Sequence, residues 1–253
     1  YAEGQQVTDN WYRRGLKVTY DAKMAPQAVD TGSMLVEHYP TAGNWQDALQ
    51  VVNALSNLDA DSRLDLFRLM RLTGALKDKH DYLAYVDAAD PRKMSNEVLP
   101  VLAEGVQAGV LSTTDPSYQQ AKSMADSRAA ADKAAAASVA ADARKSADGK
   151  IALGAGEDYF SFGAYPQAAE MYQLAIDKGV ADRNLAYERL GVAQAMQGQF
   201  GPAKASLQQV SGARAAVAKM WLAYIDTKTG VPTPPTPPAA PGVPTPPTPP
   251  AKH

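Results

Sequence analysis

The sequence predicts an all-α protein: an α-solenoid of helical hairpins with one long Ala-rich helix and a C-terminal polyproline segment. Three observations predict this fold. Apolar residues recur mainly with helical periodicity, and strand-like alternation is scarce. Residues 116–147 contain no Gly and, after the first position, no Pro. Two segments near the C-terminus repeat each other at an offset of 35 residues.

The N-terminal part of the chain contains a series of short amphipathic helices. The clearest is DSRLDLFRLMRLTGAL, residues 61–76, which opens with an acidic cap and places Leu64, Phe67 and Met70 on one apolar face before Gly74. The same reasoning predicts helices over residues 8–20, 26–38, 44–57, 80–89 and 95–108. The connections between them are short.

The Ala-rich stretch, residues 113–148, is expected to form one long helix, or two with a small break, because Ala is the strongest helix former. Its apolar face consists mostly of methyl groups. Such a helix packs closely against a neighbour but buries little area, so a structural role is favoured over a coiled-coil or membrane role.

An internal repeat follows the Ala-rich stretch. Six pairs of similar residues share one offset: Gly156 and Gly191, Gly163 and Gly198, Tyr165 and Phe200, Ala168 and Ala203, Tyr172 and Leu207, Ala175 and Val210. Small residues at these spacings describe two antiparallel helices in close contact, which is one unit of a solenoid. An irregular α-bundle with coincidental Ala spacing is the alternative.

The repeated units resemble the tetratricopeptide repeat family, whose pattern has nearly this period. The residues that match in kind are Gly156, Tyr159, Ala168, Tyr172 and Ala175 in the first unit, and Tyr187, Leu190, Gly191, Ala203 and Leu207 in the second. Val180 stands where the family has a proline at the end of a repeat. The resemblance is good over residues 150–212, degenerate over 28–112, and absent elsewhere.

This resemblance divides the chain into four parts. Residues 1–112 are degenerate helical-hairpin repeats, and 113–148 are the Ala-rich helix. Residues 149–228 are two tetratricopeptide-like repeats followed by a capping helix, in which Val217, Met220, Trp221 and Tyr224 cover the open end of the stack. Residues 229–253 form a segment rich in Pro and Thr.

Composition argues against several classes of partner. The net charge is −2, with basic and acidic residues interspersed, so nucleic acid is not expected to bind. No window approaches 18 consecutive apolar residues, so no transmembrane segment is expected. The absence of Cys is compatible with export, to the periplasm or outside the cell. A start at Tyr1 fits removal of a leader, and fits equally an arbitrary boundary.

Signals of catalysis are poor. His38, His80 and His253 have no metal-ligand spacing, and the chain has neither a G-x-S-x-G elbow nor a Walker loop. The GAG at residues 154–156 lacks the preceding strand of a dinucleotide-binding motif. We therefore expect a non-enzymatic protein without cofactor or metal. The alternative is a binding or hydrolytic accessory protein that acts on cell-envelope glycans or peptides, for which an acidic pair would have to contact the ligand.

The resemblance implies a concave surface, formed by the first helix of each pair, that binds a peptide or another protein. By alignment this partner-binding face contains Lys150, Leu153, Glu157, Phe160, Glu188, Arg189 and Val192. These residues lack the Lys/Asn/Arg set of repeats that clamp a C-terminal carboxylate. A receptor for chaperone tails is therefore disfavoured.

The sequence VPTPPTPP occurs twice, from Val231 and from Val243, within what we call the Pro-rich segment, residues 231–250. Such a segment favours polyproline II and reaches about 60 Å at about 3.1 Å per residue. It can be a spacer, or a ligand that docks on an aromatic groove of its own body or of a neighbouring copy, and we favour the ligand.

Docking would use Pro234, Pro235, Pro237, Pro238, Pro246, Pro247, Pro249 and Pro250. Exchange of these segments between copies would build rings, tubes or filaments. If the protein is exported, O-glycans could attach at Thr233, Thr236, Thr245 and Thr248.

Overall fold

The computed structural model describes residues 8–230 of the chain, which form an all-α fold without any β-strand. The N-terminal helices are α1 (Asp9–Asp21), α2 (Ala25–His38), α3 (Ala42–Leu55), α4 (Ala60–Leu72), α5 (Lys79–Ala89) and α6 (Ser95–Gln107). They are followed by α7 (Pro116–Lys145), α8 (Lys150–Ser161), α9 (Tyr165–Asp177), α10 (Arg183–Met196), α11 (Phe200–Leu207), the 3₁₀ turn η1 (Gly212–Arg214) and α12 (Ala215–Thr229). The proposed docking prolines and glycan threonines lie outside the described residues.

Side-chain caps define the start of several helices. Thr41, Asp59, Asp78, Asp115 and Asp182 each accept a hydrogen bond from a backbone N–H of the first turn. Each cap satisfies a donor that has no partner inside its own helix. The polar residues between the apolar runs therefore set where these helices begin.

The helix expected over residues 61–76 ends early, at Leu72. Gly74 has a φ of +68°, and the N–H of Ala75 donates to the carbonyl of Met70. This left-handed turn closes the last turn of α4, a conformation that glycine adopts without steric cost. The other N-terminal helices begin and end within two residues of the expected positions.

The repeated glycines mark the same contact in two successive hairpins. A Cβ atom added at Gly156 of α8 would overlap the ring of Tyr172 of α9. One added at Gly191 of α10 would lie 2.6 Å from Cγ of Leu207 of α11. The two pairs of helices therefore cross at equivalent positions, as the alignment of the repeats predicts.

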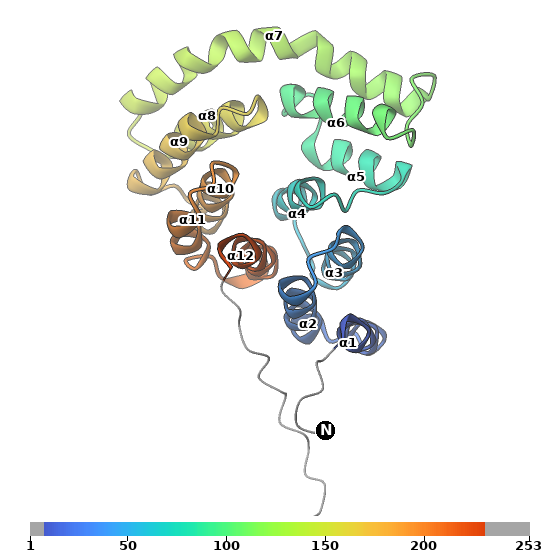
Figure 1. The fold of residues 1–253 in the computed structure, drawn as a ribbon. Helices are drawn as coiled ribbons and strands as arrows, with labels where there is room; N and C mark the ends of the chain where they lie inside the picture. The colour runs from blue at the N-terminus through green and yellow to red at the C-terminus, as the bar shows by residue number, and fades with distance from the viewer. Residues whose placement is uncertain (1–7, 231–253) are drawn as a thin grey trace, which may run out of the picture.

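The helices form two arms that meet at both ends (Figure 1). The N-terminal arm, α1–α6, and the C-terminal arm, α8–α12, are bridged at one end by α7, which packs on both α6 and α8. At the other end α12 packs on α2 and α4. The last helix thus contacts the beginning of the fold as well as the preceding hairpin.

The Ala-rich stretch is one continuous helix of 30 residues, α7. It buries mainly alanines, namely Ala121, Ala125, Ala136, Ala140 and Ala143. Their small side chains allow α7 to lie close to α6 and α8. Between residues 8 and 230, no helix combines the length and the hydropathy needed to cross a membrane.

Candidate binding site

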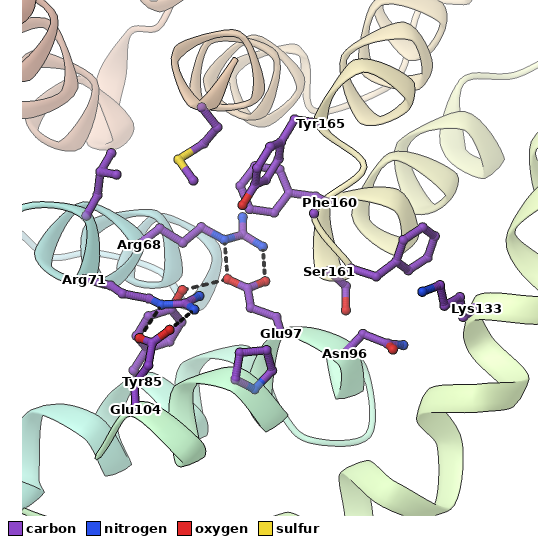
Figure 2. Close-up of a pocket in the computed structure, with 15 residues that line it drawn as sticks. Arg68, Arg71, Tyr85, Asn96, Glu97, Glu104, Lys133, Phe160, Ser161 and Tyr165 are labelled. Atoms are coloured by element: carbon purple, nitrogen blue, oxygen red, sulfur yellow. Dashed lines mark hydrogen bonds and ion pairs between the residues drawn. The ribbon is translucent and has the colours of Figure 1, made fainter. Parts of the chain in front are cut away.

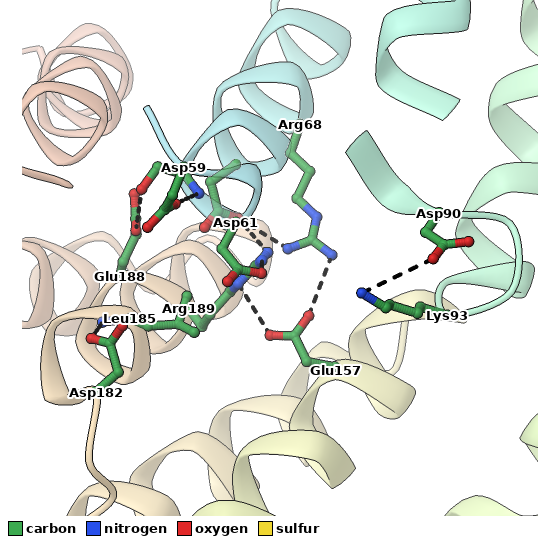
Figure 3. A network of polar contacts seen from close by, with 12 residues as sticks. Asp59, Asp61, Arg68, Asp90, Lys93, Glu157, Asp182, Leu185, Glu188 and Arg189 are labelled. Carbon is green, nitrogen blue, oxygen red and sulfur yellow. Dashed lines mark hydrogen bonds and ion pairs between the residues drawn. The ribbon is translucent and has the colours of Figure 1, made fainter. Parts of the chain in front are cut away.

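The two arms are joined by charged side chains that are buried between them. Helix α4 has buried residues on every side, including Asp65 and Arg68. Nη1 of Arg189, from α10, lies 2.8 Å from Oδ1 of Asp65, and Nη1 of Arg68 lies 3.0 Å from the same oxygen. Nε of Arg189 lies 3.1 Å from Oε1 of Glu157, from α8 (Figure 3). The network therefore links α4 to both helices that open the C-terminal hairpins.

A second group of charges extends this network toward α12. Arg214, in η1, forms two ion pairs. Its Nη1 lies 3.2 Å from Oε2 of Glu188, and its Nη2 lies 2.8 Å from Oδ2 of Asp59. Nη1 of Arg214 also donates to Oγ of Ser62 at 3.0 Å. Arg214 of the C-terminal arm thus contacts the N-cap and the first turn of α4.

Burial dominates the titration of the acids in this network. Loss of hydration raises the pKa of Asp65 to about 7, although the nearby Arg68 opposes the shift. It raises the pKa of Glu157 to about 8, again against the charge of Arg68. It also raises the pKa of Glu188. The carboxyl groups of Asp65 and Glu157 therefore change charge near neutral pH rather than near pH 4.

The structure brings most of the residues expected on the concave face into contact with α4. Phe160, Glu188, Arg189 and Val192 are buried, and Glu157 is largely buried. Leu153 is half-buried and Lys150 is exposed. Within this molecule, the partner of that face is the chain's own α4. Asp65 and Arg68, three residues apart in an otherwise apolar run, were the sequence signal for this contact.

A cavity of about 630 Å³ opens between the arms, next to the buried network (Figure 2). We call it the inter-arm cavity. Its lining comes from α4, α5, α6 and α7, the end of α8 and the turn that follows it, the start of α9, and the end of α10. Of the residues expected on the concave face, Phe160 alone is among those that line it.

Two arginine–glutamate pairs form one side of the cavity. Nε and Nη2 of Arg68 donate to the two carboxylate oxygens of Glu97 at 2.8 and 2.7 Å. The hydroxyl of Tyr85 donates to Oε1 of Glu97 at 2.8 Å. Nε of Arg71 donates to Oε2 of Glu104 at 2.8 Å, and its Nη2 donates to the other oxygen. Both acids are thereby neutralised by planar, two-point contacts.

Aromatic side chains form the opposite side. The rings of Phe160 and Tyr165 meet edge to face, with their centroids 5.0 Å apart. Phe162, in the turn, is half-buried, and Nζ of Lys133 lies 5.8 Å from its ring centroid. Arg68 stacks on Phe160 at 3.9 Å, which connects the aromatic side to the ionic side.

Three hydrogen-bond donors line the cavity without an acceptor among residues 8–230. They are the hydroxyls of Ser161 and Tyr165 and the ammonium of Lys133. Ser161 is only 7% exposed, so its hydroxyl meets the cavity rather than bulk solvent. The site therefore offers aromatic faces and donors, while its carboxylates are already occupied.

Sequence reasoning did not find this cavity. Arg68 and Glu97 are 29 residues apart, and Arg71 and Glu104 are 33 apart, so no local spacing connects them. Phe162 and Tyr165 flank the turn at Gly163, and a pair of aromatics at a hairpin turn was the only available signal.

His38 and His80 lie away from this site, and His253 is outside the described residues. The ring of His38 stacks on Tyr12, with centroids 5.5 Å apart, and His80 is an exposed residue of α5. In the part of the chain that the structure describes, no three His, Cys, Asp or Glu side chains are grouped so as to hold a metal ion. The sequence matches no protein-family model, and a search of curated proteins finds no similar sequence.

Proposed function

We propose that the protein is a non-enzymatic scaffold of the tetratricopeptide type that binds extended peptide segments and assembles with copies of itself through its Pro-rich segment, in the periplasm or outside the cell. The inter-arm cavity carries this proposal. It combines aromatic walls with donors that have no acceptor of their own, and its volume of about 630 Å³ suits several side chains of a peptide.

The repeated hairpin contact supports the tetratricopeptide type. Gly156 and Gly191 occupy equivalent crossings, and Gly163 and Gly198 take positive φ values of +77° and +72° at equivalent turns. Equivalent crossings and equivalent turns in two successive hairpins support the proposal that they are units of one repeat, and solenoid repeats serve as binding surfaces.

The state of the cavity acids favours binding over catalysis. A general acid or base must exchange a proton with a bound substrate. The oxygens of Glu97 and Glu104 instead accept hydrogen bonds from Arg68 and Arg71. A substrate would have to displace an arginine to reach either carboxylate.

Size-exclusion chromatography with light scattering tests the proposal. The measurement compares the full chain with a variant that ends at Gly230, which keeps every described helix. We expect the full chain to form species larger than a monomer, in proportion to its concentration, and the shortened chain to be monomeric. A monomeric full chain at all concentrations would contradict self-assembly.

A second candidate is the binding of cell-envelope glycan or peptide. One observation favours it: two acids, Glu97 and Glu104, do line the cavity beside aromatic faces. Sugars commonly stack on aromatic rings and hydrogen-bond to charged side chains. Titration with soluble peptidoglycan fragments would support this candidate if Phe162→Ala weakened their binding, and would dismiss it if they did not bind.

A further inference from the structure

The geometry points to one occupant of the inter-arm cavity: the Pro-rich segment, residues 231–250, of a second copy of this chain. The inference rests on the proposed function, because it names the site that self-assembly would use. In this arrangement the proline rings lie against Phe162 and Tyr165, and the peptide carbonyls accept hydrogen bonds from the cavity's free donors.

The hydrogen-bonding groups of the Pro-rich segment match those of the cavity. Eleven of the 20 residues in the segment are Pro, so its backbone offers carbonyl acceptors but few N–H donors. A matching site must supply donors and need not supply acceptors. The cavity fits this requirement, since Ser161, Tyr165 and Lys133 have donors without partners while Glu97 and Glu104 are occupied by arginines.

The shape of the cavity also suits the segment. Polyproline segments are recognised by grooves of aromatic side chains, on which the proline rings pack. Phe160, Phe162 and Tyr165 present three aromatic rings within one stretch of six residues. Pro100 and Met196 add apolar surface to the same cavity. Because polyproline II is extended before binding, little conformational entropy is lost on docking.

The charge of the segment also suits the cavity. Residues 231–250 contain no Asp, Glu, Lys or Arg. A neutral ligand neither competes for the paired arginines nor leaves a buried charge without a partner, which would cost binding energy. An acidic peptide would instead compete with Glu97 for Arg68, whose guanidinium is almost fully buried.

The position of the C-terminal helix favours a second copy. Helix α12 ends at Thr229 and lies next to α2 and far from α7, whereas α6, α7 and α8 frame the cavity (Figure 1). The molecule's own segment would have to run back over its arms to reach the site. A segment that leaves this end of one copy can enter the cavity of the next, which gives a head-to-tail contact that propagates.

Fluorescence anisotropy with a labelled peptide of residues 231–250 tests the site directly. The full chain is titrated into the peptide, and its own segment competes equally in every variant. We expect Phe162→Ala to weaken binding roughly tenfold, because it removes an aromatic face. Tyr165→Phe keeps the ring and removes one donor, so about fivefold weaker binding is expected.

The control variant is Tyr20→Ala, which removes an exposed aromatic of α1 that lines a separate recess between α1 and α3. Its affinity should equal that of the wild type. A peptide with Ala at the eight docking prolines should not bind measurably. Equal affinities for wild type, Phe162→Ala and Tyr165→Phe would overturn the inference, and thermal melts establish that the variants are folded.

Light scattering of the same full-length variants separates this inference from the proposed function. If the wild type assembles and Phe162→Ala and Tyr165→Phe dissociate, both hold. If the wild type and both variants assemble alike, assembly stands and the site is wrong. If the wild type is monomeric yet the peptide binds at Phe162, the site holds for the peptide but the second copy as its source is overturned. No assembly and no binding would overturn both.

Discussion

Asp65 is a buried carboxylate that contacts charged side chains from both arms. Its side chain accepts hydrogen bonds from Arg68 of its own helix and from Arg189 of α10, and its carbonyl accepts one from Nε1 of Trp221 of α12 at 3.1 Å. Buried ion pairs are costly to desolvate, so they add little net stability, but losing one partner is severe. These contacts therefore specify how the arms meet more than they stabilise the fold.

Replacing Arg189 with Met tests this role. Methionine is apolar and of similar length, but it leaves Asp65 and Glu157 with one fewer cation nearby. We therefore expect the free energy of unfolding to fall by about 3–5 kcal/mol. Urea denaturation measures it. The matched control is Arg144→Met, whose pair with Glu170 has side chains 51% and 57% exposed. That control should lose at most about 1 kcal/mol, and equal losses in both variants would contradict the role.

The raised pKa values predict that stability depends on pH. In the folded protein the pKa of Asp65 is about 7 and that of Glu157 is about 8. In the unfolded chain these groups take their ordinary pKa values, 3.8 and 4.5. The folded state therefore binds more protons between pH 4 and 8. The stabilisation from these groups is fully present below pH 4 and is lost as pH rises through 7 and 8.

Urea denaturation between pH 5 and 9 measures this slope. Glu157→Gln keeps the shape of the protonated acid but cannot release a proton, so its stability should fall less steeply with pH than that of the wild type. The same slope in both proteins would show that Glu157 is not the group responsible.

At the scale of single helices, α8 contains a built-in comparison between two glycines. Gly156 lies against Tyr172, while nothing lies within 4 Å of a Cβ atom added at Gly154. Gly156→Ala should destabilise the protein by about 1–3 kcal/mol through overpacking. Gly154→Ala should stabilise it by up to about 1 kcal/mol through helix propensity. Thermal unfolding compares the two, and changes of the same sign would contradict the close crossing of α8 and α9.

Helix positions could be predicted from the sequence because local periodicity and caps determine them. The segment expected to be helical ran to residue 76, but α4 ends four residues earlier, at Leu72, because Gly74 forms a left-handed turn. The alignment of Gly156 with Gly191 also anticipated a real packing contact. Periodicity cannot show, however, which helix faces which, and so the contact of α12 with α2 was not foreseen.

The candidate site was less predictable for the same reason. The alignment indicated that Glu157, Glu188 and Arg189 share one face, but not that α4 covers it. From the sequence alone, a helix face with two acids and an arginine is predicted to be exposed. Its partner, Asp65, is more than 100 residues away from Arg189, so no local pattern indicates the contact. The ionic side of the inter-arm cavity is likewise formed by pairs that are distant in sequence, Arg68 with Glu97 and Arg71 with Glu104.

At the scale of the whole molecule, α12 joins both arms into one unit. Trp221 is fully buried, and α12 packs on α2, α4 and α11. We expect Trp221→Ala to cost about 3–5 kcal/mol, because it leaves a large cavity between the arms. Met34→Ala, on the exposed side of α2, should change stability by at most about 0.5 kcal/mol.

Urea denaturation followed by circular dichroism measures both variants. A loss in Trp221→Ala as small as that in Met34→Ala would show that α12 does not hold the arms together.

This closure also decides where a partner can bind. Helix α4 covers the face of α8 and α10 that the repeat alignment assigned to a partner, so under the proposed function an extended peptide would meet the inter-arm cavity instead. A head-to-tail assembly would then place the Pro-rich segment of each copy between the arms of the next.

Nuclear magnetic resonance of the isotopically labelled full chain, titrated with unlabelled peptide of residues 231–250, locates the bound Pro-rich segment. We predict that the amide shifts of Ser161, Phe162 and Tyr165 change with the peptide concentration, together with those of Asn96 and Lys133 across the cavity. Residues of α1 should not respond. Shift changes confined to α1 and α3, or none at all, would show that the segment does not bind in the inter-arm cavity.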